Sequence, residues 1–211
     1  QIMVNGEEKS MKKKSLIAVG MAARMLCTAC QGGSDKAKTE GGKETEKTVM
    51  NIWIAGSGDA DADKAYKTVL DAYCGVGTIG LAAAAYAKSV LGVEKNGSAI
   101  RCAIQNTRDN RIHNAHFLNE DATKAIRKIV ARGERVDVVF LDPPRTGSTP
   151  EFLDAVSRMN PEKLIYISCN PKTQKRDLEF LKKKGWRVQM IQPVDLFSHT
   201  EHTECIVVVS R

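Results

Sequence analysis

The sequence of 211 residues has few aromatic residues, few cysteines and no long apolar run. Aromatic side chains make up only 5% of the chain, which leaves few platforms on which unpaired bases could stack. Six cysteines are too sparse for a disulfide scaffold, so reduced, reactive and metal-bound roles stay open. No apolar run reaches the roughly 18 residues of a membrane-spanning helix. These absences exclude small disulfide-rich proteins and polytopic membrane proteins.

The composition is otherwise that of a folded, globular chain. Apolar residues make up 42% and charged residues 27%, and the length allows one domain, or one domain and a tail. The formal net charge is +7, of which +5 falls in residues 71–211. This basic bias permits an anionic partner without identifying one.

The first fifty residues have the character of a leader and a tether. From Met11 the chain reads M-K-K-K-S-L-I-A-V-G-M-A-A-R-M-L-C-T-A-C, a basic start followed by an apolar stretch and small residues. That layout resembles a bacterial lipoprotein export signal, although Arg24 interrupts the apolar stretch. Residues 31–48 contain no apolar side chain larger than alanine, so we expect a disordered tether there.

Residues 51–67 read as a strand followed by the start of a helix. Together with the leader they resemble the beginning of a solute-binding lipoprotein of a sugar transporter, so we expect a remnant of an unrelated protein. Asp59, Asp61 and Asp63 alternate as in some calcium loops, but the glycine and distal glutamate of an EF-hand are missing. We expect no metal site.

Residues 68–211 alternate short β-branched runs with helical stretches, which predicts an α/β domain. Apolar runs that can be buried on both faces and are separated by helices indicate a parallel sheet covered on both sides. The last two runs lack an intervening helix, so we expect them to pair antiparallel. The pattern predicts a doubly wound, seven-stranded, mostly parallel sheet with an antiparallel last strand. Its strands begin near residues 68, 89, 115, 136, 163, 186 and 204.

Acidic residues follow the first strands at the edge where open α/β sheets bind ligands. The first strand leads into D-A-Y-C-G-V-G-T-I-G, in which Gly75 and Gly77 allow a sharp turn and close approach to a ligand. Glu94 ends the second strand, where its carboxylate could accept bonds from a ribose. Asp121 follows the third strand, where it could meet an adenine amino group, and Asp142 follows the fourth. A single glycine turn with this acidic series favours S-adenosylmethionine over a dinucleotide.

The fifth strand ends in I-S-C-N-P, which places Cys169 at the same edge beside the start of a helix. A thiol there could act as a nucleophile, although buried cysteines are more often inert packing. Before the last strand, D-L-F-S-H-T-E-H-T-E-C supplies Glu204, His199 and His202 as possible proton-transfer groups or metal ligands.

Four motifs in order carry a specific resemblance: D-A-Y-C-G-V-G-T-I-G-L, L-D-P-P-R-T-G, Y-I-S-C-N-P-K-T-Q-K-R-D-L and H-T-E-H-T-E-C. Over about residues 68–211 the chain resembles the RNA uracil-5-methyltransferase family. It is most similar to the 23S ribosomal RNA branch, with the transfer RNA branch close behind. The resemblance implies a Rossmann-like class I methyltransferase fold, S-adenosylmethionine as methyl donor and a uridine in RNA as acceptor.

The resemblance also implies roles for individual residues. Cys169 would add to carbon 6 of uracil, and Glu204 would remove the proton from carbon 5. Asp142 could hold the uracil edge or the donor, and Arg145 could pair a phosphate or the enolate oxygen. The residues implied for donor binding are Tyr73, Gly75, Gly77, Glu94, Asp121 and Asp142.

The chain departs from the family pattern in ways that leave alternatives open. The family's upstream oligonucleotide-binding barrel and glutamine-bearing donor motif are not recognisable, and Ser198 stands where proline is common. We therefore expect a monomeric, cytoplasmic domain with impaired activity and no iron–sulfur cluster. The alternatives are a transfer RNA methyltransferase, a catalytically silent chimeric fragment and an exported solute-binding lipoprotein.

Overall fold

The structure is a computed structural model that describes residues 67–195 and 203–211. The expectations for residues 1–50 and for almost all of 51–67 lie outside this part, as do those for Ser198, His199 and His202. Within the described residues, no helix has the length and apolar character needed to cross a membrane.

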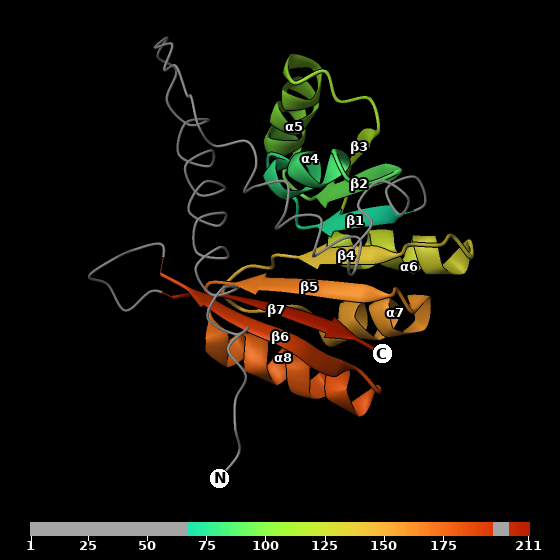
Figure 1. Ribbon diagram of the computed structural model, residues 1–211. Helices are drawn as coiled ribbons and strands as arrows, with labels where there is room; N and C mark the ends of the chain where they lie inside the picture. Colours follow the sequence, from blue (N-terminus) through green and yellow to red (C-terminus); the bar gives the residue numbers. More distant parts are fainter. Residues whose placement is uncertain (1–66, 196–202) are drawn as a thin grey trace, which may run out of the picture.

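Seven strands form one sheet in the order β3-β2-β1-β4-β5-β7-β6 (Figure 1). Only β7 runs against its neighbours, since it pairs antiparallel with both β5 and β6, whereas the other pairs are parallel. This topology confirms the predicted doubly wound sheet with an antiparallel last strand. The strands are β1 Thr68–Ala72, β2 Ser89–Glu94, β3 Ala115–Asn119, β4 Val138–Leu141, β5 Lys163–Ser168, β6 Arg187–Val194 and β7 Glu204–Ser210.

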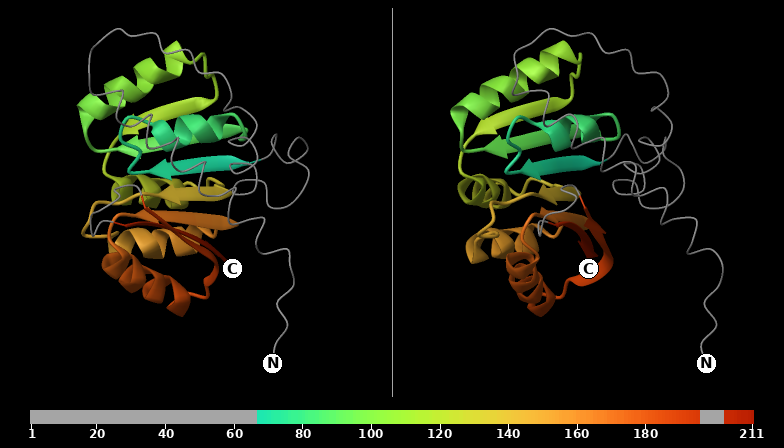
Figure 2. Two further views of the ribbon diagram at one scale, coloured as in Figure 1. Left: turned by 60° about the vertical axis from the view of Figure 1, so that its left-hand side comes forward. Right: turned by 90° about the vertical axis from the view of Figure 1, so that its left-hand side faces the viewer.

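Helices cover the sheet on both faces. α6, α7 and α8 pack side by side along one face (Figures 1 and 2). On the other face, α4 packs against β1 and β2, and α5 lies against β3 and β2. The described helices are α4 Thr78–Ala84, α5 Gly97–Asp109, α6 Ala122–Ala131, α7 Pro150–Met159 and α8 Pro171–Lys183.

Most of these helices are preceded by a residue whose side chain accepts a hydrogen bond from a backbone N–H group in the first turn of the helix. Asn96, Asp121, Thr149 and Asn170 each cap the next helix in this way. Proline is the first residue of both α7 and α8, where its missing N–H costs no hydrogen bond. These signals are local, because each capping side chain and proline stands in the sequence directly at the start of its helix.

Two apolar layers lie on the two faces of the sheet. On β1 the side chains alternate, so that Leu70 joins the layer beneath α6 and α7 whereas Val69 joins the layer beneath α4. Both residues are at most 1% exposed, and β4 is buried along its whole length. The central strands are therefore a rigid support for the loops at their ends.

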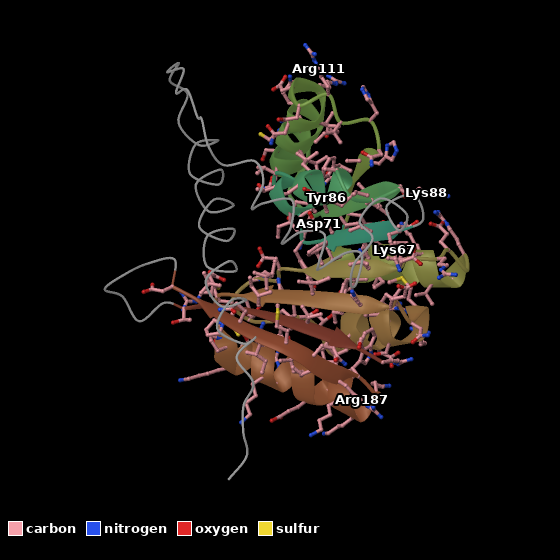
Figure 3. The ribbon with its side chains drawn as sticks, viewed as in Figure 1. Lys67, Asp71, Tyr86, Lys88, Arg111 and Arg187 are labelled. Atoms are coloured by element: carbon pink, nitrogen blue, oxygen red, sulfur yellow. The ribbon has the colours of Figure 1, made fainter. Side chains whose placement is uncertain are left out.

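The carboxyl ends of the parallel strands share one edge of the sheet, at the arrowheads in Figure 1. Lys67, Lys88 and Arg187 lie at the opposite edge, because they stand at the amino ends of β1, β2 and β6 (Figure 3). The order of the strands reverses direction between β1 and β4. Open α/β sheets bind ligands at the carboxyl edge next to such a reversal.

Candidate functional site

The glycine turn after β1 has the sharp geometry expected from its sequence. Gly75 and Gly77 have φ angles of 55° and 86°, and Gly77 is the residue before α4. A Cβ on Gly77 would lie 2.7 Å from the ring of Phe117, so only glycine fits against β3. A Cβ on Gly75 would meet nothing within 4 Å, so the backbone there borders open space.

Glu94, at the end of β2, is held by backbone N–H groups. Gly75 N donates to its Oε2 at 3.2 Å, and Asn96 N donates to its Oε1 at 2.7 Å. These bonds fix the carboxylate beside the glycine turn, and each oxygen keeps a lone pair for a further donor. Glu94 is therefore placed to accept hydrogen bonds from hydroxyl groups of a ligand at this edge.

Asp121 and Tyr73 lie at the same edge but have partners of their own. Asp121 caps α6 by accepting from Lys124 N at 3.1 Å, so its second oxygen is the one that could meet a ligand. Tyr73 has a positive φ of 63°, and its ring lies 5.7 Å from that of Phe152 between centroids. Burial raises the pKa of Tyr73, so its hydroxyl stays protonated at neutral pH.

Asp71, within β1, is a buried carboxyl that sequence reasoning did not single out. Its Oδ2 accepts from Gly80 N at 2.7 Å, which draws α4 onto the sheet (Figure 3). Its Oδ1 is buried without a hydrogen-bond partner. Burial raises the pKa of Asp71 to about 7, and the nearby charges of Asp142 and Glu94 add to the rise. The available sequence signal for this residue was its place as the acidic first residue of the motif D-A-Y-C-G-V-G.

Asp142, Arg145 and Glu204 form a charged group at the ends of β4 and β7. Asp142 is open to solvent on one side, yet the surrounding protein removes enough water to raise its pKa to about 6. The negative charge of Glu204 adds to that rise. Burial also raises the pKa of Glu204, while the positive charge of Arg145 opposes the change. Glu204 therefore lies close enough to Asp142 to influence its protonation.

Cys169 joins this group through the strand register. Ser168 on β5 pairs with Cys205 on β7, so the next residues on the two antiparallel strands are Cys169 and Glu204. The thiol is half-buried and directly precedes Asn170, the cap of α8. The register thus places a nucleophile candidate and a base candidate from distant parts of the sequence at adjoining ends of two neighbouring strands.

Residues of α8 hold the loop that carries Asp142 and Arg145, and sequence reasoning assigned them no role. The buried carboxylate of Asp177 accepts from Tyr166 Oη at 2.6 Å and from Ser148 N at 2.8 Å. Gln174, also buried, donates to the carbonyls of Tyr166 and Cys205 and so ties β5 to β7. The polar run T-Q-K-R-D within an otherwise ordinary helix was the available signal.

The structure brings the expected residues to one edge, in two groups. One group lies at the glycine turn and at the ends of β1, β2 and β3: Tyr73, Gly75, Gly77, Glu94 and Asp121. The other group lies at the ends of β4, β5 and β7: Asp142, Arg145, Cys169 and Glu204. Hollows lined by Ile104 and His116, or by Leu81 and His113, lie elsewhere on the domain. Within residues 67–195 and 203–211, no three His, Cys, Asp or Glu side chains come together as a metal site.

The fold and the site define a class I methyltransferase domain. The rRNA methylase from Streptococcus thermophilus is 13% identical and superimposes with a TM-score of 0.60, covering 83% of this chain and 99% of that one. At that identity the likeness establishes the fold alone. The tRNA (uracil-54, C5)-methyltransferase of Pyrococcus abyssi, solved with S-adenosyl-L-homocysteine, is 34% identical with a TM-score of 0.59. The match covers 68% of this chain and 34% of that one.

The chain belongs to the tRNA (Uracil-5-)-methyltransferase family, whose sequence profile matches residues 47–211. Relatives named "Uncharacterized RNA methyltransferase" in Lactobacillus johnsonii and Streptococcus mutans are each 44% identical. These matches extend over 143 and 144 residues, which in both cases is 68% of this chain and 32% of the relative. The chain thus spans about a third of the length of the curated relatives that it matches.

Proposed function

We propose that this domain transfers a methyl group from S-adenosylmethionine to carbon 5 of a uridine in RNA. The observation that supports the proposal most is the antiparallel pairing of Ser168 with Cys205, which is continued by Cys169 on one side and Glu204 on the other. Glu204 in turn lies within electrostatic reach of Asp142 and Arg145. Family membership and the methyltransferase fold support the same reaction. Among acceptors we favour ribosomal RNA, with transfer RNA as the alternative.

The carboxyl edge fits the proposed donor in its chemistry. Glu94 is fixed by two N–H groups and suits the ribose hydroxyls, and the second oxygen of Asp121 suits the adenine amino group. The open space beside Gly75 lets a ligand approach the backbone closely. Tyr73, Gly77 and Asp142 complete the proposed donor site. When bound, S-adenosylmethionine supplies an electrophilic methyl group.

The proposed reaction begins when the Cys169 thiolate adds to carbon 6 of the uracil. The new S–C bond pushes electron density to carbon 5, and Arg145 stabilises the enolate oxygen or a neighbouring phosphate. Carbon 5 would then take the methyl group from the donor's sulfonium, and the S–CH3 bond would break to leave a neutral thioether. Glu204 removes the remaining proton from carbon 5, the double bond between carbons 5 and 6 forms again, and the thiolate leaves.

The uridine has to leave its stack to reach this edge, because carbons 5 and 6 are not accessible to a thiol within a helix. Asp142 is placed to hold the edge of the extruded base or to contact the donor. Since its pKa is raised to about 6, Asp142 is mostly ionised at pH 7 but takes up a proton in mild acid. RNA as substrate also favours a cytoplasmic site of action.

The direct test is methyl transfer by the intact 211-residue chain. Unmodified ribosomal RNA and transfer RNA would be incubated separately with isotopically labelled S-adenosylmethionine, and the digested nucleosides would be separated. We expect labelled 5-methyluridine from ribosomal RNA. Label in transfer RNA alone would favour the alternative acceptor. Label on another atom, or no transfer despite calorimetric binding of the donor, would contradict the proposal.

A further inference from the structure

The loop from Asp142 to Ser148 joins β4 to α7 without regular secondary structure. It contains two prolines, and its own backbone supplies one described bond, from Gly147 N to Pro144 O at 2.8 Å. The backbone N–H and C=O groups of such a segment bind water unless other parts of the protein supply hydrogen-bond partners. The partners in this loop come from α8.

Arg176 bridges several acceptors at once. Its Nη2 donates to the carbonyls of Thr146 at 3.0 Å and Ser148 at 3.3 Å, and to Asp177 Oδ1 at 2.7 Å. Nε donates to the same carboxylate oxygen at 2.9 Å. The guanidinium therefore joins the loop backbone to the carboxylate of Asp177, although its side chain remains 58% exposed.

Asp177 fixes the same loop from the buried side. Its carboxylate is 3% exposed, and Oδ2 accepts from Ser148 N on the loop and from Tyr166 Oη on β5. Charge-assisted bonds of this kind are stronger than bonds between neutral groups. The loop is thus tied through one carboxylate to β5, the strand that ends directly before Cys169.

The amino end of α8 adds a second attachment. Asn170 Nδ2 and Thr173 Oγ1 both donate to the carbonyl of Arg145, at 2.9 and 3.1 Å. Gly147 has a φ of 80°, and a Cβ there would lie 2.6 Å from Arg176 Nη2. The loop and helix can approach this closely only because residue 147 is glycine.

From these contacts we infer that Arg176 and Asp177 are positioning residues for the proposed reaction. They hold the backbone of the loop against α8 and β5, and thereby set where Asp142 and Arg145 stand relative to Cys169. The inference rests on the proposed function, since it concerns the geometry of that reaction. A misplacement of about 1 Å at such a site can cost roughly a hundredfold in rate.

Substitution of the exposed Arg176 in the intact chain tests this role with little risk to folding. We expect Arg176→Ala to slow formation of the covalent adduct with 5-fluorouridine RNA about tenfold at saturating RNA. Calorimetric affinity for S-adenosylmethionine should change less than twofold. Arg176→Lys should not restore the rate, because an ammonium group has no counterpart of the Nε–H that holds Asp177 while Nη2 contacts the two carbonyls.

Lys175→Ala is the matched control, because Lys175 is next to Arg176, 80% exposed and 4.0 Å from its partner Glu179. It removes the same charge from the same helix and should leave the rate within twofold. If Lys175→Ala slowed adduct formation equally, or if Arg176→Lys formed the adduct at the unsubstituted rate, the inference would be overturned. Either result would mean that a positive charge on this helix acts by attracting RNA. Unchanged adduct formation in Arg176→Ala would also overturn it.

A second measurement does not depend on activity. In hydrogen exchange, the Ser148 amide should exchange several-fold faster in Arg176→Ala than in Lys175→Ala, because the loop has lost two of its attachments. Equal exchange rates would contradict the positioning role. Absence of any adduct with the unsubstituted chain would instead contradict the proposed function, while the exchange experiment would still decide how the loop is held.

Discussion

The two halves of the carboxyl edge hold their polar groups by different means. Around β1, β2 and β3, which form the proposed donor half, backbone N–H groups and glycines set the positions of Gly75, Glu94 and Asp121. Around β4, β5 and β7, which form the proposed catalytic half, a side-chain network from α8 holds an irregular loop. The first half is specified by local sequence and the second by long-range contacts, so substitutions should separate the two.

The largest separation is expected from Cys169→Ala. Loss of the thiolate removes the proposed route to a nucleophilic carbon 5, so methyl transfer should fall by at least about a thousandfold. Donor affinity and melting temperature should stay as they are, because the donor half is untouched. Transfer assays and calorimetry measure both effects, with the exposed Cys102→Ala as the control. Retained transfer in Cys169→Ala would show that the chemistry needs no such adduct.

Glu204→Gln should lower turnover by roughly a hundredfold or more, since the neutral amide cannot accept the proton of carbon 5. Because the base is needed after methyl transfer, the methylated adduct should accumulate on denaturing gels rather than disappear. Glu179→Gln on the exposed side of α8 serves as control. A loss of adduct together with turnover would move the role of Glu204 to an earlier step.

Asp71→Asn tests the buried charge within the donor half. The folded protein keeps the Asp71 proton up to about pH 7, whereas an unfolded carboxyl loses it near 3.8. Ionisation therefore favours the unfolded state, and this group lowers the free energy of unfolding as pH rises from 5 to 8, by about 2–3 kcal/mol.

Asp71→Asn keeps an oxygen for Gly80 N but has no proton to lose. Denaturant unfolding at pH 5 and pH 8 should therefore give a smaller loss of stability with pH in the variant than in the unsubstituted chain. The same pH dependence in both proteins would show that Asp71 is ionised throughout this range.

Glu94→Ala should weaken donor binding roughly tenfold to a hundredfold, because hydrogen bonds to a charged carboxylate contribute about 1.5–3 kcal/mol. It also releases the N–H groups of Gly75 and Asn96 that the carboxylate holds. Calorimetry measures the affinity, and Glu134→Ala, which removes an exposed carboxylate, is the control. Unaltered affinity in Glu94→Ala would place the donor elsewhere.

The smallest effect is expected from a pair of glycine substitutions. Gly77→Ala adds a Cβ 2.7 Å from the ring of Phe117 at a φ of 86° and should cost about 1–3 kcal/mol. Gly133→Ala shares the positive φ, but its Cβ meets nothing within 4 Å, so about 1 kcal/mol is expected. Urea unfolding compares the two variants. Equal costs would mean that close packing against Phe117 is not what requires glycine at residue 77.

The sequence was sufficient to predict much of the fold and the shared edge of the sheet at which Gly75, Glu94 and Asp121 lie. The glycine turn and the acidic residues at strand ends are local signals, and the parallel strands bring them to one edge. Proximity of Cys169 and Glu204 depends on the register of β5 and β7, which no local signal specifies. The contact between Arg176 and Thr146 joins positions 30 residues apart and required the structure. Strand register and loop attachment are tertiary properties that no local signal specifies, so only the family resemblance placed Cys169 and Glu204 in one site.

The most direct test of the account is to map the covalent adduct between the intact chain and 5-fluorouridine RNA. A base can remove a proton from carbon 5 but cannot remove fluorine there, so the elimination step is blocked and the methylated adduct stays bound to the nucleophile. The account predicts a donor-dependent methylated adduct whose cross-linked peptide, identified by mass spectrometry, carries the RNA on Cys169. A cross-link at another residue, or an adduct that survives in Cys169→Ala, would contradict it.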